Sequence, residues 1–216
     1  MGMEETVAEM VLGLDEAGRG CVLGPLVVGA YFCDAAVLAE LKTAGVTDSK
    51  KLSPRRRENL LTLLRTKGTG RLLEISPAEI DNGNINQLEE KAFIAHAIHF
   101  RPTALYLDAP VHPRGIPRLR ERLRTALAAH GLDINMIIEP KADLNHTVVG
   151  AASIFAKVQR DARIAALGNV GSGYPSDPKT RAWIKGFLDR NEPLPACVRS
   201  RWGTIDNLRQ QSLLSS

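Results

Sequence analysis

Near its start the chain carries the sequence VLGLDEAGRG, residues 11–20, in which an apolar run meets two acidic residues and a Gly-Arg-Gly link. The apolar run at residues 11–14 predicts a buried strand, and the run at residues 23–31 predicts a second one. The link is short and rich in glycine, so the two strands are close enough along the chain to pair antiparallel. The stretch therefore predicts a strand hairpin with acidic residues at the end of its first strand.

Outward from this hairpin, strand-like and helix-like segments alternate as far as residue 168, which is typical of an α/β domain. Three more strands are expected at residues 70–75, 104–107 and 134–138. Helices are expected at residues 54–68, from residue 77, and at residues 88–101, 119–129 and 147–167, with Ser53-Pro54 and Ser76-Pro77-Ala78-Glu79 as helix starts. The pattern predicts an α/β fold with a mixed five-stranded sheet flanked by helices.

The pattern changes after residue 168. Residues 171–175 read GSGYP and predict a loop, Asp177-Pro178 starts a helix, and prolines at 193 and 195 separate it from a last helix at residues 204–214. No strand pattern occurs here, and about 45 residues would be marginally stable alone. We therefore divide the chain into a sheet domain, residues 1–168, and a helical C-terminal region, residues 169–216, packed on it as a cap.

The composition indicates a globular protein of a reducing compartment. Of its 216 residues, 44% are hydrophobic and 24% are charged, which excludes wholesale disorder and a collagen-like chain. Cys21, Cys33 and Cys197 are scattered, which argues against a disulfide framework or a zinc site. The first ten residues are acidic where a secretion signal needs basic ones, and the apolar residues 23–33 are too few to span a membrane. We expect a cytoplasmic monomer without a membrane partner.

Four acidic residues stand where apolar segments end. Asp15 and Glu16 end the first strand, Asp108 ends the fourth, and Asp143 precedes the longest helix. Strand ends of an α/β sheet can converge on one edge. Four carboxylates without lysine or arginine among them would repel one another, and two divalent cations, Mg²⁺ or Mn²⁺, would balance their charge. Two such ions can activate water and stabilise the leaving oxygen in phosphodiester hydrolysis.

Each acid taken singly is also compatible with a helix cap or a turn. Asp15 and Glu16 are neighbours on a strand and point to opposite faces of it, so they share a site only if the chain bends between them.

Outside these four acids the chain is basic, because 28 lysines and arginines face the remaining 20 of its 24 acidic residues. This surplus favours a nucleic-acid substrate. Candidate phosphate contacts are Lys50, Lys51, Arg55, Arg56, Arg57, Lys141, Arg199 and Arg201. The Gly-Arg-Gly link does not fit a dinucleotide-binding loop, because a strand follows it. Its glycines instead allow the backbone to approach a ligand closely, as recognition of a ribose 2′-hydroxyl requires.

Several stretches resemble segments of the type 2 ribonucleases H, the ribonuclease HII family, and occur in that family's order. They are GLDEAGRG at 13–20, DSKKL at 48–52, LDA at 107–109, KAD at 141–143, AASIFAKVQRD at 151–161 and GSGYPSDP at 171–178. The resemblance extends over residues 11–208, and the tail is similar to that of archaeal members.

The resemblance implies a ribonuclease H-like fold and an endonuclease that cleaves the RNA strand of RNA–DNA hybrids. It also implies cutting on the 5′ side of single ribonucleotides in duplex DNA, leaving a 3′-hydroxyl and a 5′-phosphate. Asp15, Glu16, Asp108 and Asp143 would be the catalytic, metal-binding acids. Gly18, Arg19 and Gly20 would read the 2′-hydroxyl, Tyr174 would pack against the sugar at the RNA–DNA junction, and Lys50 would lie near the backbone phosphates.

Three positions depart from the family pattern and bear on substrate preference. Cys21 stands where proline commonly follows the Gly-Arg-Gly sequence, which predicts a less rigid loop and a thiol near the site that makes activity sensitive to oxidation. His146 stands where an aromatic residue is common, and residues 199–202 read RSRW in place of the more usual RRSW.

The C-terminal residues 210–216, QQSLLSS, are weakly similar to a sliding-clamp-binding peptide. They lack its terminal aromatic pair, which favours a frayed helix end over a clamp contact.

Two other functions fit part of the sequence. A non-catalytic nucleic-acid-binding module on the same fold would gain nothing from four carboxylates facing a polyanion. The other is a two-metal phosphatase or nuclease with a different substrate range. The Gly-Arg-Gly link and Tyr174 argue against it, but only because of the roles that the family resemblance gives them.

Overall fold

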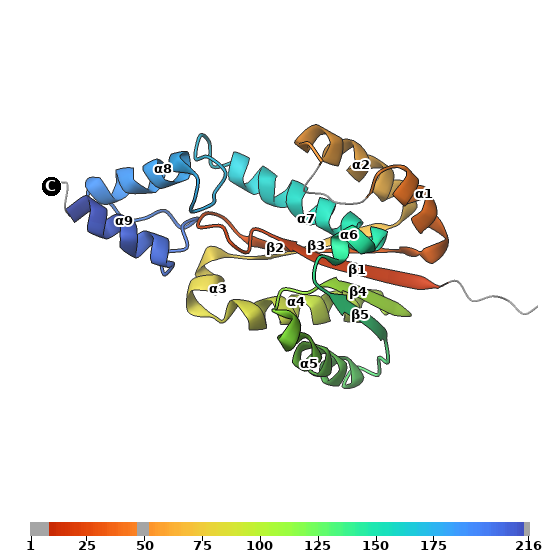
Figure 1. Ribbon diagram of the computed structural model, residues 1–216. Coiled ribbons are helices and arrows are strands. Elements are labelled where there is room, and N and C mark those ends of the chain that lie inside the picture. The colour runs from red at the N-terminus through yellow and green to blue at the C-terminus, as the bar shows by residue number, and fades with distance from the viewer. Residues whose placement is uncertain (1–8, 47–51, 214–216) are drawn as a thin grey trace, which may run out of the picture.

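The structure is a computed structural model that describes residues 9–46 and 52–213. A five-stranded sheet lies at its centre (Figure 1). Its strands are β1 (Met10–Ala17), β2 (Leu26–Asp34), β3 (Thr69–Ile75), β4 (Ala104–Asp108) and β5 (Asn135–Glu139), in the order β3-β2-β1-β4-β5. The β1–β2 and β2–β3 pairs are antiparallel, whereas the β1–β4 and β4–β5 pairs are parallel. The predicted mixed sheet is confirmed.

The first strand is longer than its apolar run. β1 continues past residue 14 to Ala17, so Asp15 and Glu16 lie within the strand and not after it. The reason is that β2 still pairs with these polar residues, Asp15 lying opposite Gly29 in the antiparallel ladder. The strand therefore ends three residues later than the predicted 11–14, and the two acids lie near its carboxyl end, as expected.

The second strand begins later than its apolar run. β2 starts at Leu26 and not at residue 23, because Gly24 has a φ of +78° and Pro25 has no N–H to donate to a strand ladder. Leu23 instead forms an isolated bridge with Val198. This bridge joins the C-terminal region to the β1–β2 connection.

Helices cover both faces of the sheet and extend beyond one end of it (Figure 1). They are α1 (Leu38–Thr43), α2 (Pro54–Lys67), α3 (Pro77–Asn82), α4 (Ile85–Phe100), α5 (Ile116–Ala128), α6 (Ala142–Asn145), α7 (Thr147–Ala165), α8 (Pro178–Asp189) and α9 (Gly203–Leu213), with short 3-10 helices at Ala35–Val37 and Pro113–Gly115. The sequence did not predict α1 or α6, because elements this short show no apolar periodicity.

Two predicted helix starts have the expected caps. The Ser53 hydroxyl accepts a hydrogen bond from the Arg56 N–H at 3.3 Å. The Ser76 hydroxyl accepts one from the Glu79 N–H at 3.2 Å, and the Glu79 carboxylate accepts one from the Ser76 N–H at 2.8 Å. These bonds satisfy N–H groups that have no partner within a helix, which explains why α2 and α3 begin where they do.

Helix α7 packs on one face of the sheet, together with α1 and α2 (Figure 1). Two strand glycines let it approach closely. A Cβ atom at Gly13 would lie 2.1 Å from the Val148 carbonyl oxygen, and one at Gly29 would lie 2.5 Å from that of Ala152. Since no larger residue fits at these points, the glycines set how near α7 lies to the carboxyl end of β1.

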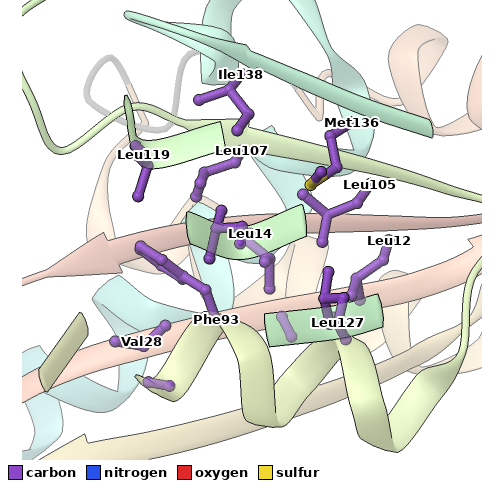
Figure 2. Close-up of a cluster of buried hydrophobic side chains, with 14 of the residues drawn as sticks. Leu12, Leu14, Val28, Phe93, Leu105, Leu107, Leu119, Leu127, Met136 and Ile138 are labelled. Carbon is purple, nitrogen blue, oxygen red and sulfur yellow. The ribbon is translucent and has the colours of Figure 1, made fainter. Parts of the chain in front are cut away.

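Helices α4 and α5 cover the opposite face, over an apolar cluster (Figure 2). Leu12 and Leu14 on β1 and Leu105 and Leu107 on β4 project into it with at most 1% exposure, following the two-residue period of a strand. Phe93 of α4 packs against them, also 1% exposed. Asp15, Glu16 and Asp108 therefore lie on strands that are covered on both faces.

Helices α8 and α9 lie beyond one end of the sheet (Figure 1). Their apolar side chains form a separate cluster that also takes in Val22 and Leu23 from the β1–β2 connection and Ile164 from α7. The division of the chain at residue 168 stays a prediction. The three cysteines are free thiols. None of the helices in the described part of the chain has both the length and the apolar character needed to cross a membrane.

Candidate active site

Three of the predicted acids meet at the carboxyl end of two neighbouring strands. Asp15 lies on β1 and Asp108 is the last residue of β4, and these strands are parallel, so they end at the same edge of the sheet. Asp143 lies on α6, directly before α7. One carboxylate oxygen of each residue lies within 4.8 Å of the other two. The structure thus brings together residues that are far apart in the sequence.

Glu16 is adjacent to this group but not part of it. Its backbone N–H donates to the Asp15 carboxylate at 2.8 Å. Glu16 lines the same pocket as Asp15 and Asp108, although the side chains of neighbouring strand residues point to opposite faces. Asp15, Asp108 and Asp143 therefore form one cluster, and Glu16 lies next to it.

Burial and mutual repulsion raise the pKa values of two of the acids, Asp15 and Glu16. The pKa of Asp15 is raised from 3.8 to about 7 by burial, with a hydrogen bond from Ser153 acting in the opposite direction and the Asp108 charge raising it again. The pKa of Glu16 is raised from 4.5 to about 8, first by burial and then by the charges of Asp15 and Asp108. Desolvation and like charge both disfavour the ionised forms, and a cation bound among the carboxylates would reverse both effects.

Asp143 shows most directly that a cation fits here. Its side chain is buried, and neither of its carboxylate oxygens has a hydrogen-bond donor among the described residues. A buried carboxylate without a partner is costly, so an ion is the natural complement. Closely spaced carboxylate oxygens are the ligands that hard divalent cations prefer. The donor set therefore fits a divalent metal.

A pocket of about 200 Å³ opens beside the acids. It is lined by Asp15, Glu16, Ala17, Gly18, Arg19, Gly20, Asp108, Lys157, Arg160 and Tyr174. Three of the four acids, the Gly-Arg-Gly loop and Tyr174, which the sequence singled out separately, thus line one cavity, whereas Asp143 is not among its lining residues. The expectation that no lysine or arginine stands among the acids is wrong, because Lys157 lines the pocket and its charge lowers the pKa of Asp15.

Helix α7 supplies site residues that the sequence reasoning missed. Ser153 and Lys157 interact with Asp15, and Arg160 lines the pocket beside Tyr174. Their spacing of four and three residues places them along one side of a helix. In the sequence, polar residues at this spacing within a mostly apolar helix are the pattern that indicates a polar stripe facing a site.

The Gly-Arg-Gly loop offers its backbone to the pocket. Gly18 has a φ of +87°, and a Cβ there would lie 2.9 Å from the Pro25 carbonyl oxygen, so only glycine fits. The Arg19 guanidinium turns to α4, where it forms an ion pair with Glu89 and donates to the Asn86 side chain at 2.6 Å. Because the Arg19 side chain is bound elsewhere, main-chain groups are what this residue presents to a ligand.

Tyr174 lies opposite the glycine loop. A Cβ at Gly20 would stand 3.8 Å from the Tyr174 ring, and the Arg160 guanidinium lies 5.1 Å from the centre of that ring. The phenol contacts Cys21, whose pKa is raised mainly by burial. Cys21 is fully buried, so its thiol faces protein and not solvent.

His146, the second departure from the family pattern, is bound away from the acids. Its Nε2 lies 3.2 Å from the carboxylate of Glu139, and its ring packs 4.9 Å from that of Tyr106. The Asn145 side chain donates to the same Glu139 carboxylate at 2.7 Å. These contacts fasten the link between α6 and α7 to the end of β5.

The candidate phosphate contacts separate into distinct groups. Lys50 and Lys51 lie outside the described residues. Arg55, Arg56, Lys141 and Arg201 are exposed, while Arg57 is partly buried and paired with Asp161. The interpretation of Arg199 as a phosphate contact is wrong, because its side chain is fully buried and its guanidinium binds backbone carbonyls.

Comparisons with known proteins agree with this arrangement. The family model described as Ribonuclease HII matches residues 12–205. The ribonuclease HII of Archaeoglobus fulgidus is 38% identical over 94% of this chain and 98% of its own. A crystal structure of the ribonuclease H2 from Pyrococcus horikoshii has a TM-score of 0.82 at 37% identity, covering 94% of this chain and 99% of that one.

A structure of the PCNA:RNase HII complex from Archaeoglobus fulgidus also matches, with a TM-score of 0.83 at 38% identity over 95% of this chain and all of that one. The chain aligns with these structures over nearly its whole length, its helical C-terminal region included, which confirms the expected ribonuclease H-like fold. The chain therefore belongs to the ribonuclease HII family, and it is a nuclease of the ribonuclease H type.

Proposed function

We propose that the protein hydrolyses the RNA strand of RNA–DNA hybrids and cuts on the 5′ side of ribonucleotides embedded in duplex DNA, leaving a 3′-hydroxyl and a 5′-phosphate. The observation that carries this proposal is the meeting of Asp15, Asp108 and Asp143 within 4.8 Å. Asp15 and Asp108 also line the pocket that holds the Gly-Arg-Gly loop. The acid cluster can bind cations that act on a phosphate, and the loop beside it can approach a ribose. Together they fit a substrate that carries both a phosphate and a 2′-hydroxyl.

In this proposal Asp15, Glu16, Asp108 and Asp143 are the catalytic acids and hold two divalent cations, Mg²⁺ or Mn²⁺. Such ions, when bound, supply charge stabilisation and an activated water for phosphodiester hydrolysis. The chain's own task is to hold the carboxylates in place and to lessen the cost of their ionisation. Lys157 favours the ionised form of Asp15, and the Ala142 N–H donates to the Asp108 carboxylate at 3.2 Å.

Substrate recognition would fall to the Gly-Arg-Gly loop and Tyr174, which line the pocket together with Asp15, Glu16 and Asp108. The backbone of Gly18, Arg19 and Gly20 would contact the ribose 2′-hydroxyl, and Tyr174 would pack against the sugar at the RNA–DNA junction. Arg160 lies against the Tyr174 ring and lines the same pocket, which supports a contact with a nearby phosphate. Lys50 would lie near the backbone phosphates.

A sliding clamp is the proposed protein partner, and the protein itself is proposed to be a monomer. The support for the clamp is the relative from Archaeoglobus fulgidus, which was solved as a complex with PCNA. The contact would use residues 210–216, of which 214–216 lie outside the described part of the chain. Leu213, on α9, is an apolar side chain with 77% exposure.

The alternative is a nucleic-acid-binding module that keeps the fold without catalysis. The acid cluster speaks against it, because buried carboxylates without cations would repel a polyanion and destabilise the protein.

The test is a cleavage assay with Mg²⁺ and a DNA duplex that contains one ribonucleotide. We expect a single cut on the 5′ side of the ribonucleotide. Asp15→Asn and Asp108→Asn are expected to reduce cleavage to background while leaving duplex binding largely intact, because they remove ligand charge and not shape.

Asp133→Asn serves as the matched control, because Asp133 is exposed and lies in the loop before β5. It is expected to cut at the wild-type rate. Undiminished turnover by Asp15→Asn or Asp108→Asn would contradict the assignment of the acids. Duplex binding without any cut by the wild-type protein would favour the non-catalytic module.

A further inference from the structure

Arg199 is the bulkiest of the fully buried side chains among the described residues, and it is a cation. It lies between α8 and α9 and reaches the connection between β1 and β2. Its guanidinium donates to the carbonyl oxygens of Gly18 at 2.7 Å, Arg19 at 2.9 Å and Gly24 at 3.1 Å. One side chain from the C-terminal region thus holds three carbonyl groups of this connection.

The direction of these carbonyls determines the direction of the neighbouring N–H groups. In a trans peptide the C=O of one residue and the N–H of the next point opposite ways, and no cis peptide occurs in the described ranges. Because Arg199 takes the carbonyls of Gly18 and Arg19, the N–H groups of Arg19 and Gly20 are directed away from it. Within residues 9–46 and 52–213 neither N–H has a hydrogen-bond acceptor, and both residues line the pocket beside the acids.

The segment that carries Arg199 is itself held on both sides. The Arg199 N–H donates to the Val22 carbonyl at 2.9 Å, which continues the contact with the β1–β2 connection. The next residue, Ser200, donates from its N–H and its hydroxyl to the Asp81 carboxylate at 2.7 and 2.8 Å. Asp81 belongs to α3, so the position of the guanidinium is set from the sheet domain.

Stability alone does not explain an arginine at this place. A buried cation is costly without a counter-ion, and among the described side chains no carboxylate forms an ion pair with Arg199. The Arg199 guanidinium instead binds carbonyl oxygens and lies 5.2 Å from the centre of the Trp202 ring. Burial lowers its pKa to about 10, so it stays charged at neutral pH. A planar guanidinium can hold three acceptors in fixed directions, whereas the compact ammonium of lysine cannot span them.

We propose that Arg199 is a positioning residue for ribose recognition, which orients the N–H groups of Arg19 and Gly20 toward the 2′-hydroxyl of the substrate. This inference rests on the proposed function, in which the Gly-Arg-Gly loop contacts that hydroxyl. It makes the C-terminal region part of the ribose site, because the side chain that sets the loop comes from residues 169–216.

The test compares two DNA duplexes that differ in one 2′-hydroxyl, bound in Mg²⁺ by protein carrying Asp15→Asn so that neither is cut. With Arg199 present, the duplex with the ribonucleotide is expected to bind more tightly than the all-DNA duplex. Adding Arg199→Lys is expected to reduce this preference about five-fold, which corresponds to one lost hydrogen bond, while the affinity for the all-DNA duplex stays unchanged. Arg118→Lys, at an exposed position of α5, is the control.

The outcomes separate this inference from the function on which it rests. If the protein with Arg199 shows no preference for the ribonucleotide, the proposed ribose contact itself fails. If that preference exists and Arg199→Lys keeps all of it, the role of Arg199 is overturned. Should Arg199→Lys not fold, Asp81→Ala loosens the same segment from outside: a reduced preference supports the inference, and an unchanged one overturns it.

Discussion

The guanidinium of Arg19, in the middle of the Gly-Arg-Gly loop, forms an ion pair with the fully buried carboxylate of Glu89 on α4. The pair crosses from the active-site edge of the sheet to the helix layer opposite α7. Together with Arg199 on its carbonyl side, it holds the loop from two directions. The loop is therefore a fastened part of the site, although it is rich in glycine.

The first prediction concerns this ion pair. Glu89→Ala leaves the Arg19 charge without its carboxylate partner, and we expect it to lower the free energy of unfolding by about 3 kcal/mol. The control is Glu90→Ala, the next residue, whose partner Arg122 is half exposed, so that this pair is worth about 1 kcal/mol. Urea denaturation of the two variants measures the difference, and equal losses would contradict a special role for the buried pair.

The second prediction concerns Tyr174. Tyr174→Ala removes the ring that faces the glycine loop, and we expect it to slow cutting at a single embedded ribonucleotide about ten-fold, the value of one lost stacking contact. Cutting of a long RNA–DNA hybrid should fall less, because further contacts hold that substrate. Tyr174→Phe keeps the ring and should retain most activity. Equal losses on both substrates in the alanine variant would argue against a junction role.

The third prediction concerns pH. The pKa values of Asp15 and Glu16 in the folded protein are about 7 and about 8, above the values of 3.8 and 4.5 that they have without a folded environment. Between the lower and the higher values the folded state holds protons that the unfolded chain has released. The metal-free protein should therefore lose stability as pH rises through this range, and the loss should be smaller in Asp15→Asn.

The raised pKa values of Asp15 and Glu16 also predict how strongly Mg²⁺ stabilises the protein at each pH. Divalent cations bind the ionised carboxylates, so the rise in melting temperature on adding Mg²⁺ should be larger at about pH 8 than at about pH 6. Removing the metal with a chelator should abolish the rise. Thermal melts with and without Mg²⁺ measure both effects, and a rise that is independent of pH would contradict the assigned protonation of the site.

The fourth prediction concerns the contact between β1 and α7. Gly13→Ala places a Cβ 2.1 Å from the Val148 carbonyl oxygen, so the helix must move, and we expect a loss of about 3 kcal/mol in the free energy of unfolding. Gly203→Ala is the control, because a Cβ there meets nothing within 4 Å. Since Asp15 and Ser153 lie farther along the same two elements, Gly13→Ala should also weaken cleavage. Similar stability in both variants would contradict the close contact.

Local patterns in the sequence were sufficient for most of the fold. Short apolar runs predicted all five strands, and Ser53 and Ser76 predicted two helix starts, because these signals depend only on neighbours along the chain. The errors lie where a distant partner decides. β1 runs on through Asp15 and Glu16 because β2 pairs with them, and no signal within residues 11–17 contains that information.

The sequence by itself determined the family and the strands, and it singled out the four acids, since a carboxylate beside a predicted strand or helix is visible without coordinates. Only the tertiary structure decided which charges surround those acids. Lys157 lies beside the acids in the pocket. Arg199 is buried and not at the surface, and its hydrogen bond to Gly18 joins residues that are 181 positions apart. Whether a basic side chain meets solvent, a carboxylate or a carbonyl depends on packing between distant segments, and composition and local periodicity carry no record of it.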